Sequence, residues 1–274
     1  MQLEGGTSYE VSLFLCAKIS QNIYMPLVKV DNLSVTYIGR KKQLTTALTN
    51  FSCEFLSNKV NVIVGESGCG KTSLLRAICQ QFEYDGEIYF DDKNVNKIPL
   101  KNRNIAYVDQ NIFLFNHMIV YDLLAYPLKR QKLKSEVINY KVKEMANILG
   151  ISDLLTRKPN QLSIGERQKV SLGKALIKEP TVCLLDEPFA NLSEQDKDDI
   201  FPYFLNAVNE KDITVILVTH DYSVALRLAD MIYVMEDSKI TFIGTKEELS
   251  NNKDNELIQY LKMSKNNGKT CKNH

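Results

Sequence analysis

One short glycine-rich segment carries the residues best suited to binding an anion. Residues 65–72 read Gly65-Glu66-Ser67-Gly68-Cys69-Gly70-Lys71-Thr72 and match the pattern G-x-x-x-x-G-K-[ST] at every fixed position. Glycines let the backbone wrap closely around an oxygen-rich group, so that successive N–H groups point inward. We therefore predict that this loop and the following Ser73 bind the phosphates of a nucleotide, with the Lys71 ammonium on the terminal phosphates and the Thr72 hydroxyl on Mg²⁺.

The flanking sequence distinguishes a true phosphate loop from a chance match. A largely apolar, strand-like run, residues 59–64, precedes the loop, and a helical run, residues 73–78, follows it. A helix in that place presents its N-terminal N–H groups to the same charge. The alternative is a glycine-rich turn that only packs tightly, and the complete pattern with both flanks favours phosphate binding.

A second segment supplies the carboxylates that phosphate chemistry needs. Residues 181–185 form a strand-like run, and Asp186 and Glu187 come directly after it. A carboxylate at the end of a buried strand is placed to hold Mg²⁺, which we predict for Asp186. The neighbouring Glu187 is placed to polarise the attacking water as a general base. A strand that merely ends on acidic surface residues is the alternative, and the phosphate loop in the same chain disfavours it.

The class of nucleotide-binding protein is indicated by a third segment. It reads Leu162-Ser163-Ile164-Gly165-Glu166-Arg167-Gln168 and resembles the L-S-G-G-[QE]-R-Q signature of ABC ATPases. The resemblance covers about residues 26–250 and implies that Ser163, Gly165 and Glu166 contact nucleotide. Ser163 and Glu166 also read as a helix capping box, S-x-x-E. The two interpretations are compatible, because a capped helix N-terminus favours an incoming phosphate.

Other residues follow in the order that this family has. Tyr37 resembles the aromatic residue that stacks on adenine, Gln110 the glutamine that senses Mg²⁺ and the membrane partner, and His220 the switch histidine that contacts the terminal phosphate and acts in catalysis with Glu187. Each has a simpler alternative. Tyr37 could pack on a neighbouring strand, Gln110 could be an exposed loop amide, and His220 could be a hydrogen-bonded histidine at a strand end.

The resemblance also implies an assembly and a mechanism. Two ABC ATPase chains, identical or different, pair head-to-tail, so that loop 65–72 of one meets Ser163 and Gly165 of the other across ATP. The expected cofactors are ATP and Mg²⁺. The expected partners are transmembrane permease subunits and an extracytoplasmic solute-binding protein, with the chain on the cytoplasmic face of the cell membrane. The stretch after Gln110, with Phe113, Phe115 and Tyr121, is expected to contact the permease.

Two positions depart from the family pattern. Ile164 replaces the first glycine of the signature, and Ser193 replaces the aspartate usual after the Glu187 strand. Ser193 still reads as a helix cap. Loss of one preorganised contact often costs about 10²–10³-fold in rate, so we predict slow hydrolysis or dependence on a more active partner subunit. The alternative function is therefore a catalytically weakened or regulatory ABC subunit.

These residues must be positioned by an α/β fold of the P-loop NTPase type. The strand-like runs alternate with longer helical stretches, which predicts a mostly parallel core sheet with crossover helices. The weaker alternating runs 28–37, 51–55 and 86–90 indicate an antiparallel β subdomain, and residues 99–178 a helical subdomain. Its amphipathic run 135–149 is closed by Gly150. We expect an unstructured extension at 1–24, an ABC ATPase domain at 25–250 and a flexible tail at 251–274.

Composition narrows the classes of partner and compartment. There are 34 Lys and Arg against 33 Asp and Glu, a formal charge of +1, which gives no global electrostatic reason to bind nucleic acid. No run approaches the ~18 apolar residues of a membrane span. The 6 cysteines are scattered without a C-x-x-C pair and are expected to be reduced.

Several stretches resemble the ATPases of sugar importers in particular. They are residues 99–106, 115–122, 157–159 and 186–192. Those family members carry a further C-terminal regulatory domain, whereas almost nothing follows Leu249 here. The open alternatives are a sugar-importer ATPase that lacks this domain and a relative that imports other small solutes, such as sulfonates or metals.

Overall fold

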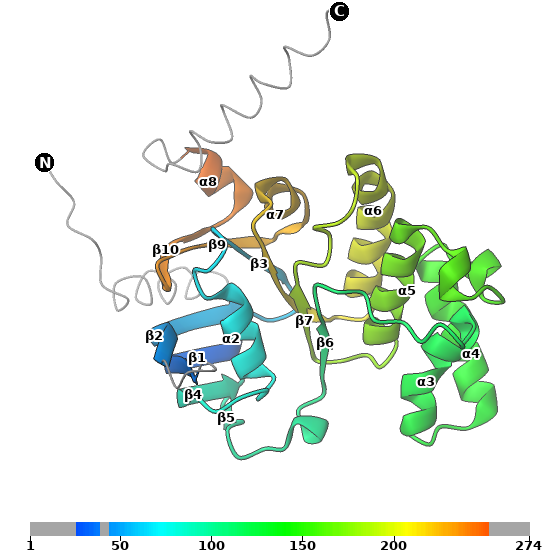
Figure 1. Ribbon diagram of the computed structural model, residues 1–274, viewed down its shortest axis with the longest axis horizontal. Coiled ribbons are helices and arrows are strands. Elements are labelled where there is room, and N and C mark those ends of the chain that lie inside the picture. The colour runs from blue at the N-terminus through cyan, green and yellow to red at the C-terminus, as the bar shows by residue number, and fades with distance from the viewer. Residues whose placement is uncertain (1–25, 39–43, 252–274) are drawn as a thin grey trace, which may run out of the picture.

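The computed structural model describes residues 26–38 and 44–251 (Figure 1). The predicted extension at 1–24 and nearly all of the predicted tail at 251–274 lie outside these residues. The described elements form two sheets with helices between and beyond them. In the view of Figure 1 the smaller sheet lies at one end of the molecule and helices α3 and α4 lie at the other.

The larger sheet has six strands in the order β10-β9-β3-β8-β7-β6. Their bounds are β3 Val60–Val64, β6 Ile105–Val108, β7 Val182–Asp186, β8 Thr214–Thr219, β9 Met231–Glu236 and β10 Lys239–Gly244. All neighbours are parallel except β10 and β9. Every residue of β3, β7 and β8 is buried, as expected for central parallel strands covered on both faces. The predicted mostly parallel core sheet is confirmed.

The smaller sheet is antiparallel in the order β2-β1-β4-β5. Its strands are β1 Pro26–Ile38, β2 Leu44–Leu56, β4 Asp85–Phe90 and β5 Lys93–Asn94. This confirms the predicted antiparallel subdomain. Helix α2, Lys71–Ile78, buries Leu74, Leu75 and Ile78 in one apolar cluster with residues of both sheets, so the helix lies between them.

The remaining helices cover the opposite face of the larger sheet or its edges. They are α3 Val120–Arg130, α4 Ser135–Ile148, α5 Ile164–Leu176, α6 Glu194–Glu210, α7 Tyr222–Leu228 and α8 Lys246–Asn251, with short 3₁₀ turns at Leu100–Asn102, Ser152–Leu154 and Pro159–Gln161. The predicted amphipathic helix is α4, and Gly150 follows it with φ +64°. The segment 99–178 contains α3, α4 and α5 but also β6, a strand of the larger sheet.

Over residues 26–38 and 44–251, no helix is both long and apolar enough to cross a lipid bilayer. A second apolar cluster joins α3, α4, α5 and α6 to the side of the sheet on which Val60, Val62 and Val64 lie. Ile63 points to the other cluster, with α2. This alternation along β3 fixes the strand, and with it the loop that starts at residue 65, between two packed layers.

Candidate nucleotide site

The glycine-rich loop joins β3 to α2 and is held closely by its neighbours. A Cβ at Gly65 would lie 2.1 Å from the carbonyl oxygen of Met235, so no side chain fits there. Gly70 has φ +108°, and a Cβ there would lie 2.7 Å from Leu48 Cδ2 and 2.8 Å from the carbonyl oxygen of Ala47. These two glycines are therefore required by strand β9 and strand β2, and they fix the backbone path of the loop.

Three parallel strands end at this loop. Strand β3 ends at Val64, β7 at Asp186 and β8 at Thr219, and β8 lies between the other two. The carboxyl ends of neighbouring parallel strands meet at one edge, where ligands of open α/β sheets bind. A cavity of ≈ 280 Å³ lies there, lined by Ser67, Gly68, Gly70, Lys71, Thr72, Ser73, Gln110, Glu187 and His220. All nine were predicted site residues.

The Lys71 side chain is held by the backbone of its own loop. Its Nζ donates hydrogen bonds to the carbonyl oxygens of Gly65 (2.8 Å) and Glu66 (2.7 Å) and lies 3.6 Å from Cys69 Sγ. The residue is 6% exposed. The ammonium thus lies at the cavity, and a phosphate oxygen is a stronger acceptor than these carbonyl oxygens because it is charged.

Asp186 is buried beside the loop with both carboxylate oxygens engaged. The Thr72 hydroxyl donates to Oδ1 (2.9 Å) and the Tyr107 hydroxyl donates to Oδ2 (3.0 Å). Burial raises the pKa of Asp186 above its usual value, against the opposing hydrogen bonds. Hydroxyl and carboxylate oxygens are the ligands that Mg²⁺ prefers, and Thr72 and Asp186 already touch, so the residues present fit this ion.

Tyr107 was not predicted as a site residue. It lies on β6, next to β7, and reaches Asp186 because the two strands are paired with Tyr107 opposite Leu184. Burial is the main reason that the pKa of Tyr107 is raised, so the hydroxyl stays a donor. The sequence held one signal, its place three residues before Gln110.

Glu187 and His220 lie in contact at the cavity. The backbone N–H of His220 donates to Glu187 Oε1 (2.9 Å), and His220 Nδ1 lies 2.7 Å from the same oxygen. The Thr219 hydroxyl donates to Glu187 Oε2 (3.1 Å). Glu187 has φ +48°, an uncommon conformation for a residue with a side chain. The carboxylate is thus oriented by the end of β8, and Thr219 is a second contact that sequence reasoning missed.

Tyr37 lies beside the loop but does not line the cavity. Its hydroxyl donates to Ser73 Oγ (3.0 Å), and its ring packs edge-on against Phe82 at 5.1 Å between centroids. Both interpretations made from the sequence, a place near the nucleotide and packing on a neighbour, are compatible with this position. Gln110 is exposed and does line the cavity.

The signature segment lies elsewhere on the same chain. Ser163 caps α5: its hydroxyl accepts from the N–H of Glu166 (3.1 Å), and the Glu166 carboxylate accepts from the N–H of Ser163 (2.7 Å). The predicted capping box is confirmed. Neither Ser163, Gly165 nor Glu166 lines the cavity formed by the loop. Within one chain, therefore, the structure brings together the phosphate loop, both carboxylates, Gln110 and His220, but not the signature.

The two departures from the family pattern lie close together. Ile164 is the first residue of α5, has no positive φ, and is 49% exposed. Ser193 caps α6, where its hydroxyl accepts from the N–H of Asp196 (3.1 Å) and donates to the Asp196 carboxylate (2.6 Å). Asp196 in turn lies against Gly165, where a Cβ would be 3.0 Å from Oδ1.

This fold and this site define a nucleotide-binding protein of the P-loop class. The chain belongs to the ABC transporter family, whose pattern matches residues 48–190, more than half of its length. It is 39% identical over 210 residues to the uncharacterized ABC transporter ATP-binding protein YcjV of Escherichia coli, covering 76% of this chain and 58% of the relative. It is also 39% identical over 208 residues to the oligosaccharides import ATP-binding protein MsmX of Bacillus subtilis, covering 76% and 57%.

The fold agrees with a solved structure of the same family. CbiO1 of Clostridium perfringens, part of the ABC transporter complex CbiONQ, superposes with a TM-score of 0.75 at 27% identity and covers 87% of this chain and 95% of that chain. The predicted ABC ATPase fold is confirmed. The present chain spans about 58% of the length of these curated relatives.

Proposed function

We propose that this chain binds and hydrolyses ATP and thereby drives a small solute through a separate membrane permease. The observation that carries the proposal is the cavity of ≈ 280 Å³ in which the phosphate loop, Gln110, Glu187 and His220 meet beside the Thr72–Asp186 pair. Family membership supports it, because relatives at 39% and 37% identity are import ATP-binding proteins.

The side chains divide the chemistry of hydrolysis among them. Lys71 and the N-terminus of α2 bind and orient the terminal phosphates, and Thr72 and Asp186 hold Mg²⁺, which neutralises phosphate charge when bound. Among the residues that the structure describes, Glu187 is the only carboxylate that lines the cavity, and its oxygens face His220 and Thr219. It is placed to accept the proton of the attacking water, while His220 contacts the terminal phosphate.

A second ABC ATPase chain completes the site in this proposal. Ser163 and Gly165 lie outside the cavity of their own chain, at the N-terminus of α5, where Ser163 is exposed and Gly165 is buried. A helix N-terminus whose N–H groups face outward favours an anion that arrives on another molecule. The head-to-tail pair predicted from the sequence places this N-terminus against the nucleotide that the partner's loop 65–72 holds.

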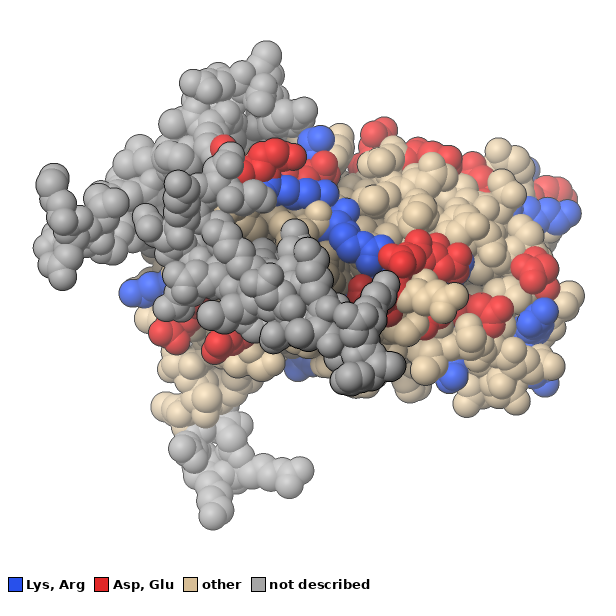
Figure 2. All heavy atoms as spheres, turned by 90° about the horizontal axis from the view of Figure 1, so that it is seen from above, with Lys and Arg blue, Asp and Glu red and all other residues tan. Residues whose placement is uncertain are grey.

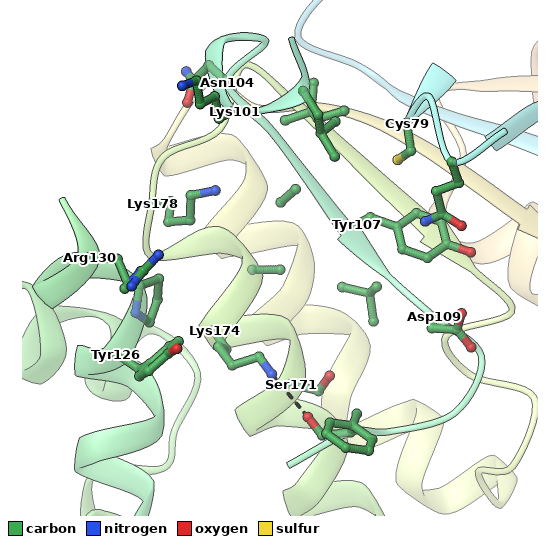
Figure 3. A pocket seen from close by; sticks show the side chains of 18 of the residues that line it. Cys79, Lys101, Asn104, Tyr107, Asp109, Tyr126, Arg130, Ser171, Lys174 and Lys178 are labelled. Atoms are coloured by element: carbon green, nitrogen blue, oxygen red, sulfur yellow. Dashed lines mark hydrogen bonds between the residues drawn. The ribbon is translucent and has the colours of Figure 1, made fainter. Parts of the chain in front are cut away.

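The permease contact is assigned to a large groove beside the helical part. It has a volume of ≈ 1300 Å³ and is lined on one side by β6 and the stretch after it, and on the other by α3 and α5. Figure 3 shows Tyr126, Arg130 and Lys174 from those helices across from Tyr107 and Asp109. Phe113 is 72% exposed there, and its carbonyl oxygen accepts from Lys174 Nζ (3.0 Å).

Exposed aromatic side chains in a groove of this size suit a short helix of a permease on the cytoplasmic side of the membrane. Phe115 lies with Phe113 in the groove. Tyr121 does not line the groove, because it packs partly buried against the apolar core. The contact of Tyr121 with the permease stays a prediction.

The direction and class of solute are proposed from the relatives. Three relatives are named as import ATP-binding proteins, for oligosaccharides, for trehalose and maltose, and for molybdate and tungstate. We infer import with an extracytoplasmic solute-binding protein. The oligosaccharide relative is 39% identical to this chain, and the other two are each 37% identical. The acidic and basic side chains that lie side by side on the face shown in Figure 2 give no electrostatic reason to add nucleic acid as a partner.

The test is ATP turnover of the full chain with and without Mg²⁺, beside Glu187→Gln and Lys71→Ala. We expect Mg²⁺-dependent turnover in the parent and, in Glu187→Gln, an ATP-stabilised dimer seen by light scattering. Lys71→Ala should lose ATP binding. A parent that binds no ATP, or a Glu187→Gln variant that turns over ATP as fast as the parent, would refute the proposed function.

A further inference from the structure

A partly buried ion pair lies beside the turn that carries the histidine of the site. Lys197, in the second turn of α6, is 6% exposed, and its Nζ lies 2.5 Å from Asp221 Oδ2 and 2.7 Å from Glu194 Oε1. The Asp221 side chain is 27% exposed and that of Glu194 69%. The Lys197–Asp221 contact is thus the better shielded of the two, and it joins α6 to the residue after His220.

Asp221 holds the turn between β8 and α7. Its Oδ1 accepts from the N–H of Ser223 (2.8 Å) and so caps α7, and its own N–H donates to the Thr219 hydroxyl (3.0 Å). Burial would raise the pKa of Asp221, but hydrogen bonds from Lys197 and Ser223 more than offset this and leave it below its usual value. The carboxylate is therefore ionised when it meets the ammonium.

The turn 219–221 is fixed from two sides. On the cavity side, Thr219 and His220 donate to the Glu187 carboxylate. On the far side, Asp221 is held by Lys197. Lys197 does not line the cavity and was not among the predicted site residues. It reaches the site only through the turn that carries His220.

We propose that Lys197 is a positioning residue that sets the contact between His220 and Glu187. The proposal rests on the proposed function, since these two residues are its catalytic pair. Lys197 is buried and Asp221 is partly buried, so removing the ammonium leaves the Asp221 carboxylate without its compensating charge and lets the turn shift toward water. A shift of 1 Å at a catalytic group can cost about 10²-fold in rate.

The test compares four variants for ATP turnover: Lys197→Met, Lys197→Arg, Asp221→Asn and, as matched control, Lys211→Met. Lys211 follows the same helix and is also largely buried, with Glu144 at 3.0 Å and Glu179 at 3.4 Å, but it pairs with α4 and the segment before β7. Asp221→Asn keeps an oxygen to cap α7 and removes only the charge.

We expect kcat to fall about 10–10²-fold in Lys197→Met, with KM for ATP unchanged because the phosphate loop is intact. Lys197→Arg should recover most of the rate, and Lys211→Met should keep it. The double variant Lys197→Met/Asp221→Asn should lose less than the sum of the two single effects. A normal kcat in Lys197→Met, or an equal loss in Lys211→Met, would overturn the inference.

A second readout separates this inference from the proposed function. The imidazole NMR signals of His220, assigned by their loss in His220→Gln, report its contact with Glu187 without any turnover. They should move toward those of a solvent-exposed histidine in Lys197→Met and stay unchanged in Lys211→Met. No turnover in the parent would refute the proposed function, whereas His220 signals that are unchanged in Lys197→Met would refute the positioning role.

Discussion

At the scale of single residues, Ile164 shows why a departure from a sequence pattern needs a structure to interpret. A glycine can be required for its backbone freedom or for its lack of a side chain. Ile164 is helical without positive φ and 49% exposed, so no backbone strain is present. What remains is the bulk of the side chain on the surface that would meet the partner's nucleotide.

Ile164→Gly is therefore expected to raise ATP turnover and to strengthen ATP-dependent dimers, because it removes that bulk. Glycine in a helix costs roughly 1 kcal/mol relative to alanine, so unfolding measured in urea should change only slightly. Ile164→Ala is the intermediate control. Turnover that stays at the parental level in both variants would show that the isoleucine does not obstruct the site.

Ser193 leads to a less obvious prediction, because its hydroxyl donates to the Asp196 carboxylate at 2.6 Å. Ser193→Asp restores the carboxylate usual in the family but places it against a second one. The two like charges repel, so this variant should be less stable than the parent and gain no turnover. The double variant Ser193→Asp/Asp196→Asn avoids this repulsion and should turn over ATP faster than the parent and faster than Ser193→Asp. A gain in Ser193→Asp alone would contradict this reasoning.

The residues that could be predicted from the sequence are those in contiguous motifs. The pattern of residues 65–72 sets a backbone path whatever surrounds it, and Asp186 follows from the strand that it ends. Tyr107, Thr219 and Lys197 could not be predicted, because each acts through one contact with a residue distant in sequence. Those contacts depend on strand order and helix packing, which no local pattern contains.

At the scale of elements, the same limit explains β6. The central strands β3 and β7 are largely apolar runs and were predicted closely. Strand β6 has only four residues, too few to show a periodicity, and it lay inside the segment predicted to be largely helical. Its pairing with β7, a neighbour some eighty residues later in the sequence, makes it a strand.

The junction of α6 with α7 gives a prediction on pH. Because the folded-state pKa of Asp221 is lowered, its ionised form stabilises the fold above the pKa of an unfolded aspartate, about 3.9. That contribution to stability is lost as the pH falls below the pKa of the unfolded aspartate and then through the lower pKa of Asp221 in the folded state. The free energy of unfolding in urea should thus be smaller for Asp221→Asn than for the parent at pH 7, and the difference should shrink below about pH 4. A difference that stays constant down to pH 3 would contradict it.

At the scale of the whole molecule, the position of the signature decides how the chain must work. The cavity collects residues from the segments that follow β3, β6, β7 and β8, whereas the N-terminus of α5 lies outside it. If hydrolysis needs both the cavity and the N-terminus of α5, then two chains contribute to each site. A variant that is inactive in its cavity can then regain turnover when it is mixed with a variant that is inactive at its α5 N-terminus. Such recovery is a property of the dimer, and measurements on one variant alone cannot detect it.

The prediction uses Lys71→Ala and Ile164→Asp. Lys71→Ala removes the phosphate-binding ammonium, and Ile164→Asp puts a negative charge where the partner's phosphate would arrive. Aspartate is favourable in the first turn of a helix, so α5 should remain folded. Each variant alone should be inactive. An equimolar mixture should recover up to about a quarter of parental turnover, because half the dimers are mixed and each of these has one intact site of two.

Circular dichroism on each variant would establish that both are folded, and light scattering with ATP that mixed dimers form. Recovered turnover then requires that the loop of the Ile164→Asp chain works with the signature of the Lys71→Ala chain. A mixture of folded, dimeric chains that stays inactive would contradict a head-to-tail shared site. Activity in Ile164→Asp alone would show that the N-terminus of α5 does not receive phosphate, since a carboxylate there must repel it.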